Sequence, residues 1–129
     1  NGLPIFYKRI RYFLVSGYSW HIAIHMKELS YKLFFKAFSN KTRFKIIQLL
    51  RKGPRNVTEI CRQLRFEQSR VSHNLRCLMR CGFVENRKDG RQVIYSLNKR
   101  TIKPLLGLID RHIIKYSAHL KRCGILKEK

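Results

Sequence analysis

Residues 57–97, VTEICRQLRFEQSRVSHNLRCLMRCGFVENRKDGRQVIYSL, restrict the possible folds more than any other part of the chain. Apolar side chains recur there at helical spacing in two successive stretches, which predicts two helices that each bury one face. They are Val57, Ile60, Cys61 and Leu64 in the first stretch and Val71, Leu75 and Leu78 in the second. Only a tight turn separates the stretches, so the two helices are expected to form a helix-turn-helix.

A β-hairpin is predicted directly after the second helix. Gly82 ends that helix, and residues 93–97, VIYSL, are of the β-branched and aromatic types that strands favour. Between them lies RKDGR, residues 87–91, in which Asp89-Gly90 favours a tight turn. A helix-turn-helix followed by a hairpin has the order of a winged helix-turn-helix. The wing tip carries three cations, Arg87, Lys88 and Arg91.

Helical patterns flank this unit on both sides. An apolar stripe predicts a helix from Lys27 to a cap at Ser39-Asn40, and the next predicted helix ends at Gly53-Pro54. A last helix is expected from a cap at Thr101 to about Cys123. The predicted fold class is mainly α with a small β-hairpin (α+β), in the order α-α-α-α-β-β-α. The predicted domains are a basic, weakly ordered extension over residues 1–26, the winged helix-turn-helix domain over 27–123, and a tail over 124–129.

The charge of the chain is strongly basic. Twenty-nine Lys and Arg against seven Asp and Glu give a formal net charge of +22 over 129 residues, which favours association with a polyanion. Lys and Arg interrupt every long hydrophobic run, and no run approaches the ~20 apolar residues that span a bilayer. An integral membrane protein is therefore not expected, and nucleic acid is the expected partner.

The free face of the second helix suits a DNA duplex. Short polar groups and guanidinium groups on one helix can hydrogen-bond base edges in a major groove, while cations on a wing reach phosphates or a minor groove. The predicted DNA-binding residues are Gln68, Ser69, Arg70, Ser72, His73, Asn74 and Arg76 on the helix and Arg87, Lys88 and Arg91 on the wing. The sequence thus predicts a protein that binds double-stranded DNA.

The four cysteines do not form the disulfide framework of a secreted protein. Cys61 lies on an apolar helix face, and Cys77 and Cys81 share one helix face at a spacing of four residues. Reduced thiols and a cytoplasmic location are expected. The pair at 77 and 81 could bind a single soft cation, and neighbouring arginines would favour thiolates. Equally, the pair could bind no metal: Cys77 would then be a partly exposed thiol, and Cys81 a small apolar residue that precedes the glycine at the end of the helix.

Several motifs resemble the ArsR/SmtB family of metal-responsive repressors over roughly residues 28–123. They are KAFSNKTRFKIIQLL, VTEICRQL, QSRVSHNLRCLMRCGFV and DGRQVIYSL. Thr42-Arg43, Ser69, Gly82 and Tyr95 are among the matching positions. The chain departs from the family pattern at Asn74, where a histidine is usual, and at Phe38 and Lys41, where leucine and proline are usual.

The resemblance implies a homodimer that pairs through its first and last helices, binds a palindromic operator and is released by an inducer. The sequence NLRCLMRCGFV is similar to the cadmium/lead-sensing branch, which implies a site of Cys77 and Cys81 completed by Cys123 of the dimer partner, with Cd, Pb or Zn as inducer. The family's two-cysteine site on the third helix is not expected, because Cys61 stands there alone. Zinc and nickel sensors imply an alternative site at Asp110, His112 and His119, whose helical stripe also fits a half-polar dimer seam.

Two other classes of function are alternatives to a metal-released repressor. An enzyme is not expected, because the chain has no phosphate-binding glycine loop and no nucleophile paired with a base. A basic architectural or viral-type protein that coats DNA without sensing anything would suit the charge of +22. A thiol redox-responsive regulator is a minor variant. Sequence-specific DNA binding that a metal reverses would distinguish a metal-released repressor from a protein that only coats DNA.

Overall fold

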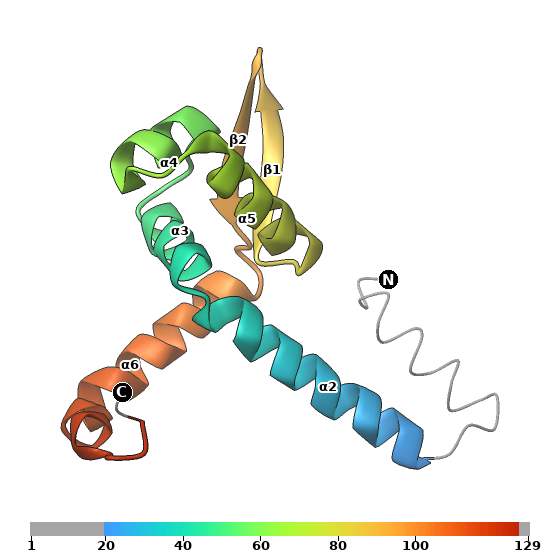
Figure 1. The fold of residues 1–129 in the computed structure, drawn as a ribbon, viewed down its shortest axis with the longest axis vertical. Helices are drawn as coiled ribbons and strands as arrows, with labels where there is room; N and C mark the ends of the chain where they lie inside the picture. The colour runs from blue at the N-terminus through green and yellow to red at the C-terminus, as the bar shows by residue number, and fades with distance from the viewer. Residues whose placement is uncertain (1–19, 127–129) are drawn as a thin grey trace. The chain divides into compact units, whose positions relative to one another are not determined.

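The computed structural model of the chain describes residues 20–126, and the side chains from Lys27 on together with that of His25. The chain divides into two compact units, one ending at Asn40 and the other beginning at Lys41. The described part contains four helices, a two-stranded hairpin and a last helix, in that order (Figure 1). This order confirms the predicted α+β winged helix-turn-helix. Within the same range, no helix has both the length and the apolarity needed to cross a membrane.

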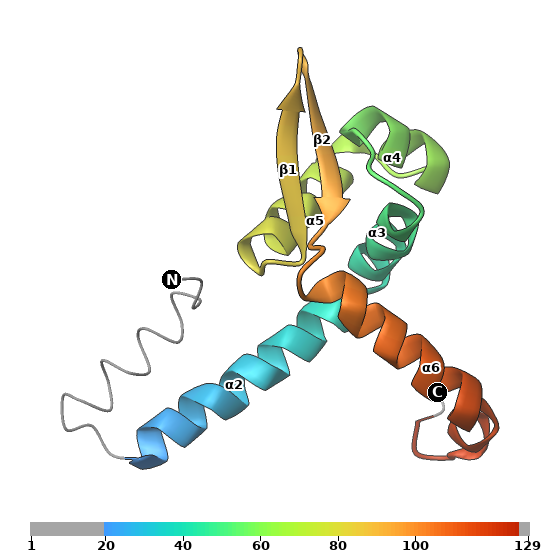
Figure 2. The same cartoon turned by 180° about the vertical axis from the view of Figure 1, so that it is seen from behind.

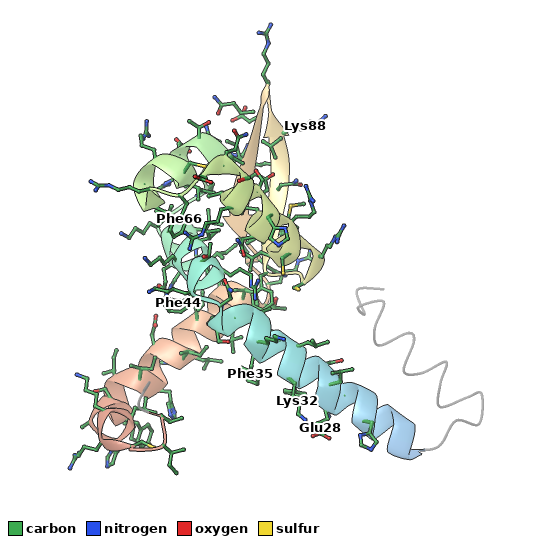
Figure 3. All side chains as sticks on the ribbon, in the orientation of Figure 1. Glu28, Lys32, Phe35, Phe44, Phe66 and Lys88 are labelled. Carbon is green, nitrogen blue, oxygen red and sulfur yellow. The ribbon has the colours of Figure 1, made fainter. Side chains whose placement is uncertain are left out.

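The described part of the first unit is helix α2, Trp20–Ser39. Phe34 lies edge-on to Phe35 with ring centroids 5.4 Å apart and stacks on Phe38 at 6.2 Å, while Glu28 and Lys32 form an exposed ion pair at 3.3 Å (Figure 3). The helix was predicted to begin at Lys27, but it begins at Trp20. The added stretch, residues 20–26, has no Gly or Pro, and adding a turn to an existing helix costs little. Residues 1–19 of the predicted extension and 127–129 of the predicted tail lie outside the described residues.

Three helices build the core of the second unit: α3 (Lys41–Arg51), α4 (Val57–Leu64) and α5 (Gln68–Arg80). Of the apolar positions that the helical spacing selected, Ile60, Val71, Leu75 and Leu78 are buried, while Val57, Cys61 and Leu64 are only half-buried. The almost fully buried side chains are Ile46, Ile47, Ile60, Val71, Leu75, Leu78 and Phe83. Each of them contributes roughly 1.5–3 kcal/mol by leaving water, so this small cluster holds the three helices together.

Local capping fixes where α4 begins and ends. Asn56 accepts a hydrogen bond from the Glu59 backbone N–H at 2.8 Å, and the Glu59 carboxylate accepts one from the Asn56 N–H at 2.9 Å. This reciprocal pair is a capping box, which satisfies two amide groups that have no partner within the helix. At the other end Arg65 takes the left-handed conformation with φ of 56°. The reversal directs the chain into α5 within three residues.

The end of α5 shows why a glycine is needed there. Gly82 has φ of +74°, and its N–H donates to the Met79 carbonyl at 3.1 Å, while the N–H of Phe83 donates to the Leu78 carbonyl at 2.9 Å. This pair of bonds is a Schellman motif, which requires a left-handed residue. The motif turns the chain so that Phe83 enters the core and the wing begins at the next residue.

The wing consists of β1 (Val84–Asp89) and β2 (Gln92–Leu97), which pair antiparallel (Figure 2). Only Gly90 and Arg91 lie between the paired residues Asp89 and Gln92, and Gly90 has φ of +61°. A positive φ at the first central position suits a tight two-residue turn. The strands are longer than expected: Arg87 and Lys88 were predicted in the connecting loop, but they belong to β1 and pair with Ile94 and Val93. Hairpin pairing continues to the turn because the turn geometry matches the strand twist.

Hydrogen bonds attach β2 to the segment that precedes α4. The backbones of Arg55 and Tyr95 exchange hydrogen bonds of 3.0 and 2.8 Å, which places one extra bridge beside β2. The Asn56 side chain donates to the Gln92 side chain at 3.1 Å. Because the residues that start α4 also hold β2, the direction of the wing depends on the start of the first helix of the helix-turn-helix.

Helix α6, Ile102–Arg122, follows the wing. Thr101 was predicted to cap it, but its side chain makes no capping hydrogen bond. The Asn98 carboxamide oxygen instead accepts from the N–H groups of Arg100 and Thr101 at 2.9 and 3.2 Å. Asn98 thus forms a turn before the helix, because its short side chain bonds backbone N–H groups two and three residues later.

An ion pair joins α6 to α3. The Arg51 guanidinium donates to both carboxylate oxygens of Asp110, one of them at 3.2 Å and the other in a shorter contact. This two-point geometry orients both groups more strictly than a single charged contact. The pair holds the pKa of Asp110 below its ordinary value, chiefly through the hydrogen bond from Arg51.

This ion pair gives a pH dependence to the stability of the second unit. Because the pKa of Asp110 is lowered in the folded chain, its contribution is present above the ordinary carboxylate pKa and is lost as the pH falls through the folded value. We expect the free energy of unfolding of the wild type to exceed that of Asp110→Asn near neutral pH, and the gap to close towards acid, as measured by urea unfolding at several pH values. Asp89→Asn, which makes the same charge change on the exposed wing, should show a smaller gap. Equal behaviour of the two variants would contradict this account.

Candidate nucleic-acid interface

One face of α5 is open to solvent and polar. Helix α5 lies beside the wing (Figures 1 and 2). Most of the predicted base-reading side chains on this helix are exposed. The exposed ones are Gln68, Ser69, Arg70, His73 and Arg76, and Ser72 is half-buried. This face combines hydroxyl, amide, imidazole and guanidinium groups, which can donate to or accept from base edges.

Asn74 was predicted on this open face, and that placement was wrong. Its side chain is only 8% exposed, and its amide donates to the Arg70 carbonyl one turn earlier at 2.8 Å. Positions 71, 74, 75 and 78 form the buried stripe of the helix, so a residue at 74 must face the core. Its polarity is satisfied locally, which makes burial acceptable. Of the adjacent pair at 73 and 74, His73 is therefore the residue available to a ligand.

Arg70 is exposed but held in place by its own chain. Its guanidinium donates to the Thr42 hydroxyl, with an Nε to Oγ1 distance of 3.1 Å, and lies 3.9 Å from the centre of the Phe66 ring. Lys45 also lies above that ring, at 5.6 Å from its centre (Figure 3). A cation over an aromatic face and a hydrogen bond to α3 together fix the start of α5. Arg70 thus positions the helix that presents the polar face.

Sequence reasoning missed two residues of this arrangement, Thr42 and Phe66. Thr42 is buried at 8% exposure in the first turn of α3, far from α5 along the chain. In the sequence, Thr42 was indicated only by the Thr42-Arg43 pair within the motif KAFSNKTRFKIIQLL. Phe66 lies in the turn between α4 and α5, where a single aromatic residue has no periodic partners that would reveal its role.

The wing presents three exposed cations, Arg87, Lys88 and Arg91. Lys88 points away from the tip of the hairpin (Figure 3). Arg87 lies 3.8 Å from the Asp89 carboxylate, and both side chains are well exposed, so this pair is weak and leaves the guanidinium able to exchange partners. Lys88 and Arg91 carry no such internal partner among the ion pairs of the described residues. The wing can therefore contact phosphates.

Cys77 and Cys81 meet on α5, as the spacing predicted. Partial burial, followed by the proximity of Cys77, raises the pKa of Cys81. Arg43 of α3 acts to lower this pKa, but burial and Cys77 outweigh it. The side chains of Arg76 and Arg80 are exposed and act through water.

The remaining predicted ligands do not gather with this pair within one chain. Among the described residues, no group of three or more His, Cys, Asp or Glu side chains is placed to hold a metal. Cys61 and Cys123 are partly buried free thiols. For the alternative site, the Asp110 carboxylate is engaged by Arg51, and the rings of His112 and His119 both lie against Tyr116, at 4.7 and 6.1 Å between centroids.

The sequence is similar to known regulators. Residues 40–86 match the family model described as bacterial regulatory protein, arsR family. A probable mercury resistance operon repressor of Streptomyces lividans is 36% identical over 75 residues, which is 58% of this chain and 60% of that protein. The HTH-type transcriptional regulator NmtR of Mycobacterium tuberculosis is 36% identical over 89 residues, covering 60% of this chain and 74% of that protein. These relatives are transcriptional regulators and not enzymes.

A solved structure shows a similar arrangement. The homodimeric winged helix-turn-helix DNA-binding domain of Mb0332 from Mycobacterium bovis, titled a possible ArsR-family transcriptional regulator, matches with a TM-score of 0.67. It is 26% identical and covers 80% of this chain and 94% of that one. This structural match covers more of the chain than the family segment at residues 40–86.

Proposed function

The chain belongs to the ArsR family of bacterial regulatory proteins, and from that premise we propose that it is a homodimeric repressor that binds a palindromic operator and is released by a soft metal ion. The observation that carries the DNA-binding part is the open polar face of α5 beside the basic wing. In this proposal Ser69, Ser72 and His73 read base edges in the major groove. Arg76 and the wing cations hold the flanking phosphates.

The held geometry of α5 favours sequence-specific binding over coating. A protein that only coats DNA needs positive charge, and a net charge of +22 would supply it without any fixed helix. Here the Arg70 side chain is bound to Thr42 and Phe66, so the start of α5 is oriented before any DNA arrives. Preorganised donors and acceptors are what direct readout of bases requires.

The homodimer is proposed from the apolar surface of α6 together with the named likeness. Ile113, Tyr116 and Leu120 lie on one stripe of the helix and are 44%, 38% and 41% exposed. In α2, Leu29 and Leu33 are similarly exposed. Apolar stripes of this extent are usually covered by a partner, and a two-fold partner would place two copies of α5 against one palindrome.

The thiols are proposed as the metal site because Cys77 and Cys81 lie one turn apart on α5, near enough for Cys77 to raise the pKa of Cys81. The Streptomyces relative is named for mercury resistance, which also points to a thiophilic ion. Cys77 and Cys81 would hold the ion with Cys123 of the partner subunit as third ligand. When bound, the ion would connect α5 of one subunit to the end of α6 of the partner subunit. This connection would change the spacing of the two α5 helices in the dimer. The affinity for the operator would fall because the two helices would no longer fit both half-sites.

The first prediction separates base readout from phosphate contact. Alanine at Ser69, Ser72 and His73 should cost roughly 1–3 kcal/mol on the operator and much less on random duplex. Alanine at Lys88 and Arg91 should weaken binding to both and reduce the salt slope by about one unit per lost contact. Fluorescence anisotropy at several salt concentrations measures both quantities. Arg62→Ala, on α4, is the charge-matched control. Equal losses on operator and random DNA from the helix set would show that α5 does not read bases.

The second prediction concerns assembly. Ile113→Glu with Leu120→Glu places two charges in the stripe of α6, and we expect monomers that bind the operator weakly because each monomer holds only one reading helix. Sedimentation velocity measures the oligomeric state, and circular dichroism checks that the helices remain. Lys115→Glu with Lys121→Glu brings in two acids at exposed positions off the 113/116/120 stripe and should leave the dimer intact. A monomeric wild type at micromolar concentration would refute the dimer.

The third prediction concerns the thiols. Cadmium should produce a thiolate-to-metal charge-transfer band and release the operator, and Cys77→Ser, Cys81→Ser and Cys123→Ser should each abolish both effects. Cys61→Ser is the control and should respond like the wild type. Because burial raises the pKa of Cys81, this ligand stays protonated to higher pH, and cadmium affinity should fall as the solution is acidified. A full response in the variants at 77 and 81 would exclude these residues as the sensor.

A further inference from the structure

A cavity lies where α3 ends, β2 ends and α6 begins, all within the second unit. Its volume is about 340 Å³. Leu50 and Leu97, both nearly buried, provide an apolar floor, and Lys99, Lys103 and Arg51 supply cations around it. None of the described residues that line the cavity is Asp or Glu. The lining therefore combines apolar surface with the positive charges of Lys99 and Lys103, whereas the charge of Arg51 is paired with Asp110.

A glycine in the middle of α6 keeps this cavity open. Gly107 lines it, lies within a regular helix and does not have a positive φ. A Cβ atom built on Gly107 would meet no atom within 4 Å, so close packing within the chain does not require glycine there. Glycine weakens a helix interior relative to alanine. Gly107 therefore lowers the stability of the helix and leaves space next to the apolar floor of the cavity.

The cations differ in how free they are. The Arg51 guanidinium is committed to Asp110 in a two-point contact, so its planar donors are not available for a second bidentate partner. Lys99, which precedes α6, and Lys103, in its first turn, are exposed and lie four residues apart. Two ammonium groups act as point charges and suit a single small anionic group, and the apolar floor disfavours a strongly hydrated dianion.

From this combination we propose that the cavity binds a small organic carboxylate with a compact apolar body. The carboxylate pairs with Lys99 and Lys103, and the body rests on Leu50 and Leu97 in the space beside Gly107. A ligand there touches the end of the wing and the start of α6 at once, next to the Arg51–Asp110 pair. Its effect on DNA rests on the proposed repressor function, and by linkage the operator and the carboxylate change each other's affinity by the same factor.

Benzoate is the probe. Binding to the full chain is followed without DNA by chemical shifts of benzoate and of the protein, with inorganic phosphate as a second ligand. We expect saturable benzoate binding that phosphate does not displace at equal concentration. Lys99→Gln with Lys103→Gln should weaken it about tenfold or more, a change of 1.4 kcal/mol per factor of ten. Gly107→Leu should abolish it by filling the cavity, while Gly107→Ala should retain a folded helix and reduced binding.

Matched controls separate a site from general attraction to a basic chain. Lys45→Gln with Lys52→Gln removes the same charge from a different groove, between α3 and α4, and should leave benzoate binding unchanged. Equal weakening by both lysine pairs, or displacement by phosphate, would overturn the proposal, as would the absence of saturable binding. Operator binding by the same samples is measured separately, so failure of this cavity is distinguishable from failure of the repressor function.

Discussion

The interface depends on the burial of one stripe of α5. Val71, Leu75 and Leu78 are almost fully removed from water against Ile60, Ile46 and their neighbours, which leaves the helix a single rotational setting. A helix turned by one residue would expose these side chains at a cost of several kcal/mol, roughly 1.5–3 for each. The polar residues between them face outward as a consequence of this packing. The direction of every proposed base contact follows from the core and not from the polar residues themselves.

Periodic and positional signals predicted most of this fold from the sequence. The apolar spacing gave α3, α4 and α5, Gly82 marked the end of α5, and Asp89-Gly90 located the hairpin turn. These features are local, because they depend on residues a few positions apart. The start of α2 at Trp20 was not predicted, since residues 20–26 lack an amphipathic pattern and a helix can extend without one.

The features that escaped prediction depend on partners distant in sequence or on satisfaction of buried polar groups. Asn74 was expected on the open face because asparagine is usually exposed, and only its hydrogen bond to the Arg70 carbonyl explains its place in the buried stripe. Arg70 was expected to be free, whereas its partner Thr42 lies 28 residues earlier. Likewise Cys77 and Cys81 were correctly placed together, but the influence of Arg43 on Cys81 came from another helix.

The ion pair between Arg51 and Asp110 suggests why events on α6 would reach the DNA-binding surface. Arg51 is the last residue of α3, whose first turn holds Thr42 and therefore Arg70. A helix transmits displacement along its axis with little loss because its hydrogen bonds are internal. A shift of α6 that moves Asp110 would move α3 and, through Thr42, the start of α5. Both proposed effectors, a metal at the ends of α5 and α6 and a carboxylate beside Gly107, would act on this one connection, so their effects on operator affinity should not be independent.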